Sequence, residues 1–218
     1  MKERIHYLDI AKGILILCLM LSHFGSAIRR LELENEWFNF LLYFTPFYAC
    51  FFMQCFFIIS GFCSNFKGSF TDFIKKQIRQ IVIPWVAFEV IGLILSTLFW
   101  GDLRVAYSLV FPPNTTLWFF SALLISKLYC YFIINYIKSN SLLLVVGLLL
   151  LFFALVINQY NVLPNLFAFK NALAACFFVA VGYVLKEKGF SNRLLGFGMI
   201  VYILSIIIIK IFSIEQLY

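Results

Sequence analysis

Apolar segments close to 20 residues long recur along the whole chain and constrain its fold more than any other feature. A bilayer core about 30 Å thick is crossed by about 20 helical residues, whereas a membrane barrel is built from strands of alternating polarity. No strand-length alternation of apolar and polar residues occurs here. Because a backbone in lipid must satisfy its own hydrogen bonds, the chain is expected to be all-α, a polytopic bundle of transmembrane helices.

Seven spans are predicted by a hydropathy window of about 19 residues. The fifth and sixth are short for a full crossing, and a re-entrant sixth segment is an alternative. No linker or repeat divides residues 1–218, so we expect a single domain. The chain stops almost directly after the seventh span, which suggests a shortened protein. The expected spans lie near residues 8–27, 40–63, 80–100, 117–137, 141–158, 170–186 and 195–213.

Basic residues are concentrated in alternate loops, and this bias sets the expected orientation. Lys and Arg residues are more frequent in cytoplasmic loops than in external ones. Here they precede the first expected span and follow the second, fourth and sixth, so the N-terminus is predicted to be cytoplasmic. The residues concerned are Lys2, Arg4, Lys67, Lys75, Lys76, Arg79, Lys138, Lys186, Lys188 and Arg193.

Composition argues against two other classes of protein. Hydrophobic residues form 63% of the chain and charged residues only 12%, against roughly 25% charged residues in soluble domains. The net charge of +7 is spread over short loops instead of forming one basic patch, so nucleic acid is not an expected partner. The six cysteines lie in apolar runs without paired metal spacing, so we expect no metal site and no disulfide framework.

The first expected span carries a cation and a histidine at opposite ends. Lys12 and His23 are eleven residues apart, so at about 100° per residue they share one helix face, separated by about 16 Å along the axis. Snorkelling of Lys12 and an interfacial role for His23 are the simpler alternative. Ionisable residues within spans are costly to insert and commonly functional, which makes His23 and Lys12 candidate functional residues.

Two further stretches suggest binding near the inner surface. In "FFIISGF", Ser60 and Gly61 would allow a ligand or another helix to approach closely, and helix packing is the simpler alternative. In "KKQIRQIVIPW", Lys75, Lys76 and Arg79 suit the phosphates of an anionic cofactor, although the positive-inside rule alone explains them equally well.

Glu89 and Lys127 are ionisable residues placed within the expected third and fourth spans. Each lies about ten residues from the predicted inner boundary, so a structural ion pair is favoured and a proton relay is the alternative. Trp118 begins the fourth span at the outer interface, where an aromatic belt is the default and contact with an acceptor substrate is the functional alternative.

Taken together, these stretches resemble the membrane-bound acyltransferase family 3, bacterial O-acyltransferases of surface glycans. The Leu8-Asp9 leader with Lys12, Gly13 and His23 is similar to the family's first helix. "FFIISGF", "KKQIRQIVIPW", "LWFFSALL" and "CFFVAVGYVLKEK" resemble later family segments in the same order. Lys12 stands where Arg is commoner, Ser22 where Gly is frequent, and the family's last three or so helices are expected to be missing.

The resemblance implies a function for these residues. Acyl-CoA, usually acetyl-CoA, would dock from the cytoplasm with its phosphates near Lys12, Lys75, Lys76 and Arg79 and its arm running toward His23. His23 would act as general base or as transient acyl carrier. The acceptor would be a hydroxyl of an extracytoplasmic glycan or lipid-linked sugar, and the protein would sit in the bacterial inner membrane. A non-catalytic binding or transport subunit, or an inactive shortened member, is the alternative.

Overall fold

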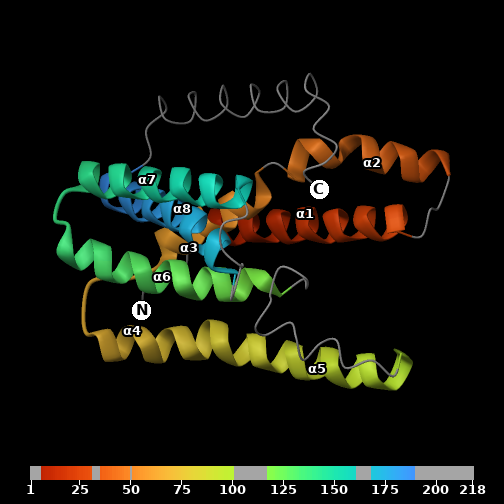
Figure 1. Ribbon diagram of the computed structural model, residues 1–218, viewed down its shortest axis with the longest axis horizontal. Coiled ribbons are helices and arrows are strands. Elements are labelled where there is room, and N and C mark those ends of the chain that lie inside the picture. Colours follow the sequence, from red (N-terminus) through yellow and green to blue (C-terminus); the bar gives the residue numbers. More distant parts are fainter. Residues whose placement is uncertain (1–5, 31–34, 50, 101–116, 161–167, 190–218) are drawn as a thin grey trace. The chain divides into compact units, whose positions relative to one another are not determined.

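The computed structural model describes residues 6–30, 35–49, 51–100, 117–160 and 168–189, and these residues are almost entirely helical (Figure 1). No strand occurs among them, so the all-α, polytopic fold class is confirmed. A π-helix, η1 (Ile78–Val82), joins α4 and α5 into one continuous helical segment. The α-helices are α1 (His6–Arg30), α2 (Glu36–Ala49), α3 (Phe52–Cys63), α4 (Phe70–Gln77), α5 (Ile83–Trp100), α6 (Trp118–Tyr136), α7 (Asn140–Gln159) and α8 (Phe169–Lys188).

Five helical segments within the described residues are long and apolar enough to cross a membrane. They correspond to the first, third, fourth, fifth and sixth expected spans. The sixth is a continuous helix of 20 residues, so it shows no re-entrant break. The seventh expected span, 195–213, lies outside the described residues. The five segments are His6–Ser26, Phe70–Leu95, Trp118–Tyr136, Asn140–Gln159 and Phe169–Lys188.

The second expected span, residues 40–63, is wrong as a single helix. The structure divides it into α2, which ends at Ala49, and α3, which begins at Phe52. At 1.5 Å per residue these helices are only about 21 Å and 18 Å long, and neither crosses a core of about 30 Å alone. Hydropathy missed the division because the residues around it are as apolar as the two helices.

The third expected span begins at Phe70 and not near residue 80. Asp72 lies in the first turn of α4, where a negative charge stabilises the helix N-terminus. Lys75 and Lys76 therefore belong to the helix itself instead of to the loop before it. The segment Phe70–Leu95 has 26 residues, about 39 Å at 1.5 Å per residue, so its first turns extend to the membrane surface.

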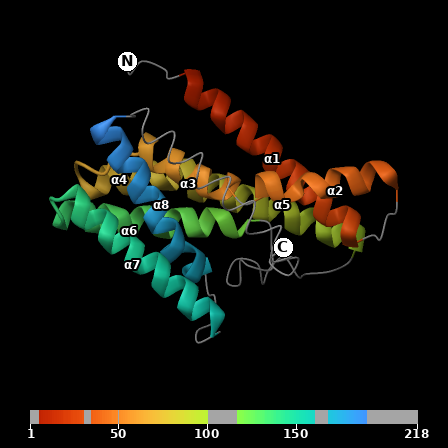
Figure 2. The same cartoon turned by 90° about the horizontal axis from the view of Figure 1, so that it is seen from above.

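The described helices fall into two compact units, each considered by itself. The first contains residues 1–59 and 185–218, and the second contains residues 60–184. In the first unit α2 packs on α1 (Figure 2), and the ring of Phe24 meets Phe38 edge to face with centroids 6.2 Å apart. The expectation of one domain for residues 1–218 stays a prediction.

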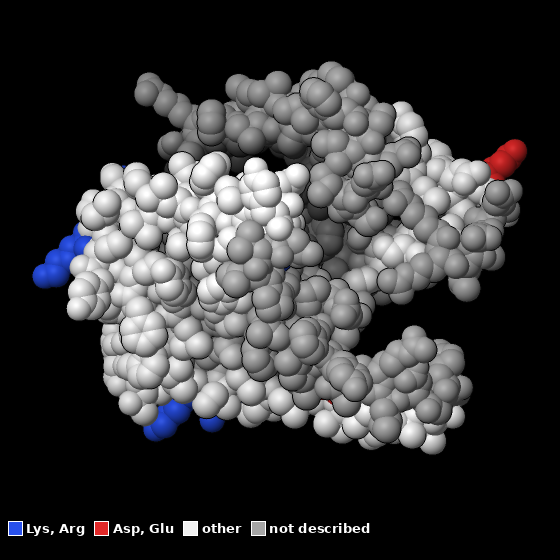
Figure 3. All heavy atoms as spheres, in the orientation of Figure 1, with Lys and Arg blue, Asp and Glu red and all other residues white. Residues whose placement is uncertain are grey.

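The second unit is packed around α8. In this helix 56% of the spanning window is buried, against 17% in Phe70–Leu95. The Sγ atoms of Cys130 on α6 and Cys176 on α8 lie 3.2 Å apart as free thiols. The outward side chains are apolar, as with Leu149 on α7, which is 62% exposed. Nearly all described atoms on the face in Figure 3 are uncharged, as a lipid-facing surface requires.

Candidate functional site

α1 carries Lys12 and His23 on one uninterrupted helix. The Nζ atom of Lys12 lies 3.8 Å from Oδ1 of Asp9, one turn earlier, and 41% of the Lys12 side chain is exposed. An exposed pair of this kind holds its charges weakly, contributing about 0–1 kcal/mol to stability. Lys12 is therefore able to exchange Asp9 for another anion.

His23 is exposed and lies in the part of α1 that packs on α2. The neighbouring Phe24 makes the edge-to-face contact with Phe38, and the hydroxyl of Ser26 donates to the Ser22 carbonyl at 3.0 Å. These contacts hold the helix on both sides of His23 without covering its imidazole. The ring is thus accessible to a reactant.

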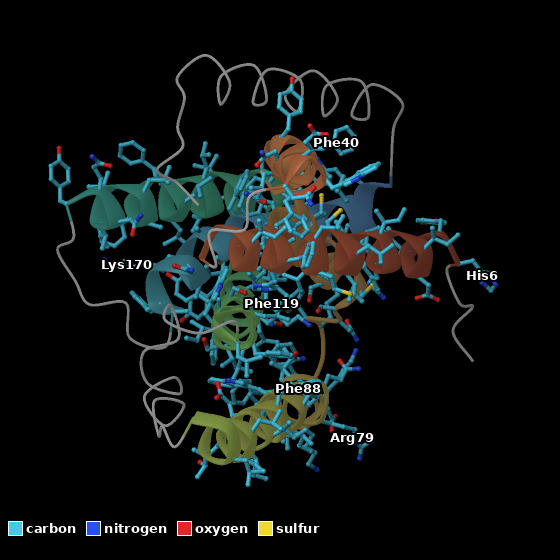
Figure 4. The ribbon with its side chains drawn as sticks, turned by 90° about the vertical axis from the view of Figure 1, so that its right-hand side faces the viewer. His6, Phe40, Arg79, Phe88, Phe119 and Lys170 are labelled. Atoms are coloured by element: carbon cyan, nitrogen blue, oxygen red, sulfur yellow. The ribbon has the colours of Figure 1, made fainter. Side chains whose placement is uncertain are left out.

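Lys75, Lys76 and Arg79 gather on one stretch of the second unit and are all exposed. The two lysines lie in the last turn of α4, and Arg79 is the second residue of η1. Figure 4 shows Arg79 and Phe88 leaving this segment on different sides, with Phe88 directed toward Phe119 on α6 and Arg79 directed away. Arg79 can therefore meet an anion on the outer side of the segment, and the exposed side chains of Lys75 and Lys76 are accessible to an anion as well.

Gly61 lies where α3 meets α8, as the helix-packing alternative predicts. A Cβ atom at this position would overlap the carbonyl oxygen of Val179 and would lie 2.9 Å from its Cα. Ser60 is half-buried, and its carbonyl accepts a hydrogen bond from the Ser64 hydroxyl at 2.7 Å. Donor binding by Ser60 and Gly61 stays a prediction, while the close approach of two backbones is a property of the fold.

Glu89 and Lys127 are both buried, with 6% and 7% of their surface exposed. The Nε1 atom of Trp85 donates to Oε1 of Glu89 at 3.2 Å. Because the helix begins at Phe70, Glu89 lies farther from its inner end than the sequence indicated. Their pairing stays a prediction, and so does the proton relay.

Trp118 is the first residue of α6 and is half-buried. Its ring meets Phe119 edge to face with centroids 6.5 Å apart, and its carbonyl accepts from the Ser121 hydroxyl at 2.9 Å. This arrangement suits both an interfacial anchor and an aromatic surface on which a sugar ring could stack. Contact with the acceptor stays a prediction.

Two buried polar residues of the second unit were missed by sequence reasoning. Lys170 is the second residue of α8 and is only 5% exposed, and it is marked in Figure 4. Gln77 ends α4 and is 2% exposed. A signal existed for Lys170, since it is an isolated cation at the start of an apolar run. Gln77 gave none, because its burial depends on the helix packed against it.

The predicted donor site draws on both compact units. Lys12 and His23 belong to the first, whereas Ser60, Gly61, Lys75, Lys76 and Arg79 belong to the second. Convergence of these residues on one acyl-CoA molecule stays a prediction. Within the described part of the chain, no three His, Cys, Asp or Glu side chains are grouped so that they could hold a metal ion.

Comparison with known proteins identifies the family to which the candidate site residues belong. The family described as an acyltransferase domain, the acyltransferase family 3 of the resemblance above, matches residues 5–216. This match covers almost the whole chain, including every candidate site residue named above. No curated protein and no solved structure matches the chain.

Proposed function

The chain belongs to the acyltransferase family 3, and on that premise we propose that it moves an acyl group, with acetyl as the first candidate, from cytoplasmic acyl-CoA to a sugar hydroxyl outside the membrane. The observation that carries the proposal is the continuous helix α1, with Lys12 near its start and His23 eleven residues later. One helix thus carries an ammonium group and an imidazole, separated by about 16 Å along its axis.

The chemistry assigned to His23 is proton removal from the acceptor. An imidazole nitrogen takes the proton of the acceptor hydroxyl as its oxygen attacks the thioester carbon. The carbon–sulfur bond then breaks, the acyl group stays on the sugar oxygen, and the coenzyme leaves as a thiol after receiving a proton. In the alternative route His23 attacks the thioester first and carries the acyl group to the hydroxyl.

The donor is assigned to four cations that the charge bias of the sequence predicts to lie on the cytoplasmic side. Lys12, Lys75, Lys76 and Arg79 all have exposed or half-exposed side chains, which phosphate oxygens can reach. Guanidinium and ammonium groups form strong charge-assisted hydrogen bonds with phosphate. The acceptor is assigned to the opposite side, near Trp118, and would be a glycan or a lipid-linked sugar in the bacterial inner membrane.

A transfer assay in lipid tests the proposal directly. The 218-residue chain is purified into lipid nanodiscs and given acetyl-CoA with a radiolabelled acetyl group, alone and with candidate sugar acceptors. We expect label to be released slowly as acetate without an acceptor and transferred when a suitable sugar is present. Failure to bind or consume acetyl-CoA, under conditions in which the protein remains folded, would contradict the proposal.

Replacing Lys12 should weaken donor binding more than folding. We expect Lys12→Ala to raise the KM for acetyl-CoA about 10- to 100-fold, since a hydrogen bond to a charged group contributes about 1.5–3 kcal/mol. Lys12→Arg should restore most of the affinity because it preserves the charge. Lys138→Ala, at an exposed lysine outside the site, is the matched control. Unchanged donor affinity in Lys12→Ala would instead favour simple snorkelling.

A further inference from the structure

Gln77 has a buried acceptor that the fold leaves unused. The residue is 2% exposed, and its Oε1 atom has no hydrogen-bond partner. Its Nε2 atom donates to the Phe73 carbonyl over a long 3.5 Å. A buried polar group without a partner is destabilising, so an unpaired oxygen at this position suggests a group that is satisfied by a ligand.

A change of helix type begins immediately after Gln77. The residues Ile78–Val82 form η1, and single turns of π-helix inside longer helices are frequent at functional sites. The buried positions of the whole segment recur every fourth residue. These positions are Phe73, Gln77, Ile81, Trp85 and Glu89.

The π-helix keeps the polar members of this series on one face. In a regular α-helix each step of four residues rotates by about 40°, so the three steps from Gln77 to Glu89 would rotate by about 120°. One extra residue in a turn restores about 100° of that rotation. Gln77 and Glu89 can therefore both face the interior of the second unit, which a regular helix of this length would prevent.

Lys127 lies on the neighbouring helix α6, at about the level of Gln77. The rings of Phe73 and Tyr131 stack with centroids 4.6 Å apart, and those of Phe88 and Phe120 lie 6.5 Å apart. The α4–α5 segment and α6 therefore run in opposite directions, as Figure 1 also shows. Gln77 is four residues beyond Phe73, and Lys127 is four residues before Tyr131, so both occupy the same level of this interface.

An acceptor and a cation at one level suit a ligand that carries an amide group. The Oε1 atom of Gln77 can accept the amide N–H, and Lys127, which has three N–H donors and already interacts within the protein, can donate to the carbonyl. The pantetheine arm of coenzyme A contains two amides. Since Gln77 lies only seven residues from the start of α4 at Phe70, such an arm would reach it from the cytoplasmic side.

We propose that Gln77, with Lys127, binds an amide of the pantetheine arm of the acyl donor. This inference rests on the proposed function, because it assumes an acyl-CoA donor. It adds a binding residue on the buried face of the segment, distinct from the exposed cations that are assigned to the phosphates. Recognition of the arm and recognition of the phosphates are thereby separated between the two faces of one helix.

The test compares Gln77→Met with Gln80→Met in the full chain in nanodiscs. Methionine preserves the length of the side chain and removes its hydrogen bonds, and Gln80 is an exposed glutamine of the same segment. We expect Gln77→Met to weaken acetyl-CoA binding about 3- to 10-fold. S-acetylpantetheine has both amides and no nucleotide phosphates, and its affinity is measured by competition with labelled acetyl-CoA. Gln77→Met should bind it more weakly than wild type does, by the same factor. Gln80→Met should change neither.

A second pair of probes separates donor recognition from structural support. Wild type is compared on acetyl-CoA and on analogues in which one pantetheine amide is replaced by an ester, which lacks the N–H. We expect one of these ester analogues to bind wild type about 3- to 10-fold more weakly than acetyl-CoA does. Gln77→Met should bind that analogue and acetyl-CoA with the same affinity. If wild type does not distinguish amide from ester, or Gln77→Met distinguishes them equally, the inference is overturned while the proposed function stands. If wild type does not bind acetyl-CoA, both fail.

Discussion

His23→Ala should abolish acyl transfer while leaving a protein that inserts and folds normally. Loss of a general base costs about 10²- to 10⁴-fold in rate, and loss of a covalent acyl carrier would remove that route altogether. The side chain is exposed on α1, so its removal leaves no cavity in the helix packing. The measurement is transfer of radiolabelled acetyl from acetyl-CoA, with thermal unfolding of the purified protein followed in parallel.

His6→Ala is the matched control for this experiment. His6 is the only other histidine of the chain, and it is exposed at the first residue of α1. We expect this variant to retain wild-type activity and stability. Normal transfer by His23→Ala would refute the assigned role of His23, whereas equal losses in the two variants would indicate a general effect of altering the helix.

Gly61→Ala should be strongly destabilising, more so than alanine at Gly13 or Gly147. The added Cβ would overlap the backbone carbonyl of Val179 on α8, and backbone cannot move aside as the end of a flexible side chain can. Overpacking of a tight contact costs about 1–3 kcal/mol or more. The measurement is the unfolding temperature of the purified variant in one detergent or lipid, compared with wild type.

Two other helical glycines give a graded control series. A Cβ at Gly147 on α7 would lie 3.2 Å from the Phe177 Cα, while one at Gly13 on α1 would meet nothing within 4 Å. We expect a small loss of stability for Gly147→Ala and no loss, or a gain of about 0.5–1 kcal/mol, for Gly13→Ala because alanine favours the helix. An unfolding temperature for Gly61→Ala equal to that of Gly13→Ala would contradict the close packing of α3 on α8.

Much of the fold could be predicted because it depends on local chemistry. A run such as residues 141–158 is helical in lipid whatever surrounds it, since only a helix or a closed barrel satisfies its backbone there. The structure accordingly has α7 at Asn140–Gln159. The break between Ala49 and Phe52 could not be predicted in this way, because a hydropathy window responds to apolar content, which stays high across the break.

The candidate site, too, has features that depend on local sequence and features that depend on the surrounding structure. The placement of Lys12 and His23 on one helix could be predicted from sequence, because their spacing follows from the helical repeat alone, while their roles stay predictions. The depth of Glu89 could not, because it depends on where the helix begins. The structure places that beginning at Phe70 and inserts η1 before α5, and both changes alter which residues face the interior.

The sequence alone predicted a helical membrane protein with a charged first helix, because insertion energetics act along one chain segment at a time. Its motifs predicted an acyltransferase through their resemblance to a known family, and the family match confirms that assignment. Only the tertiary structure decided that Gly61 is a contact with α8 and that the Oε1 atom of Gln77 is buried without a partner. The physical reason is that burial is a property of two packed surfaces. The sequence of the helix that carries a residue specifies one of those surfaces, and the neighbouring helix supplies the other.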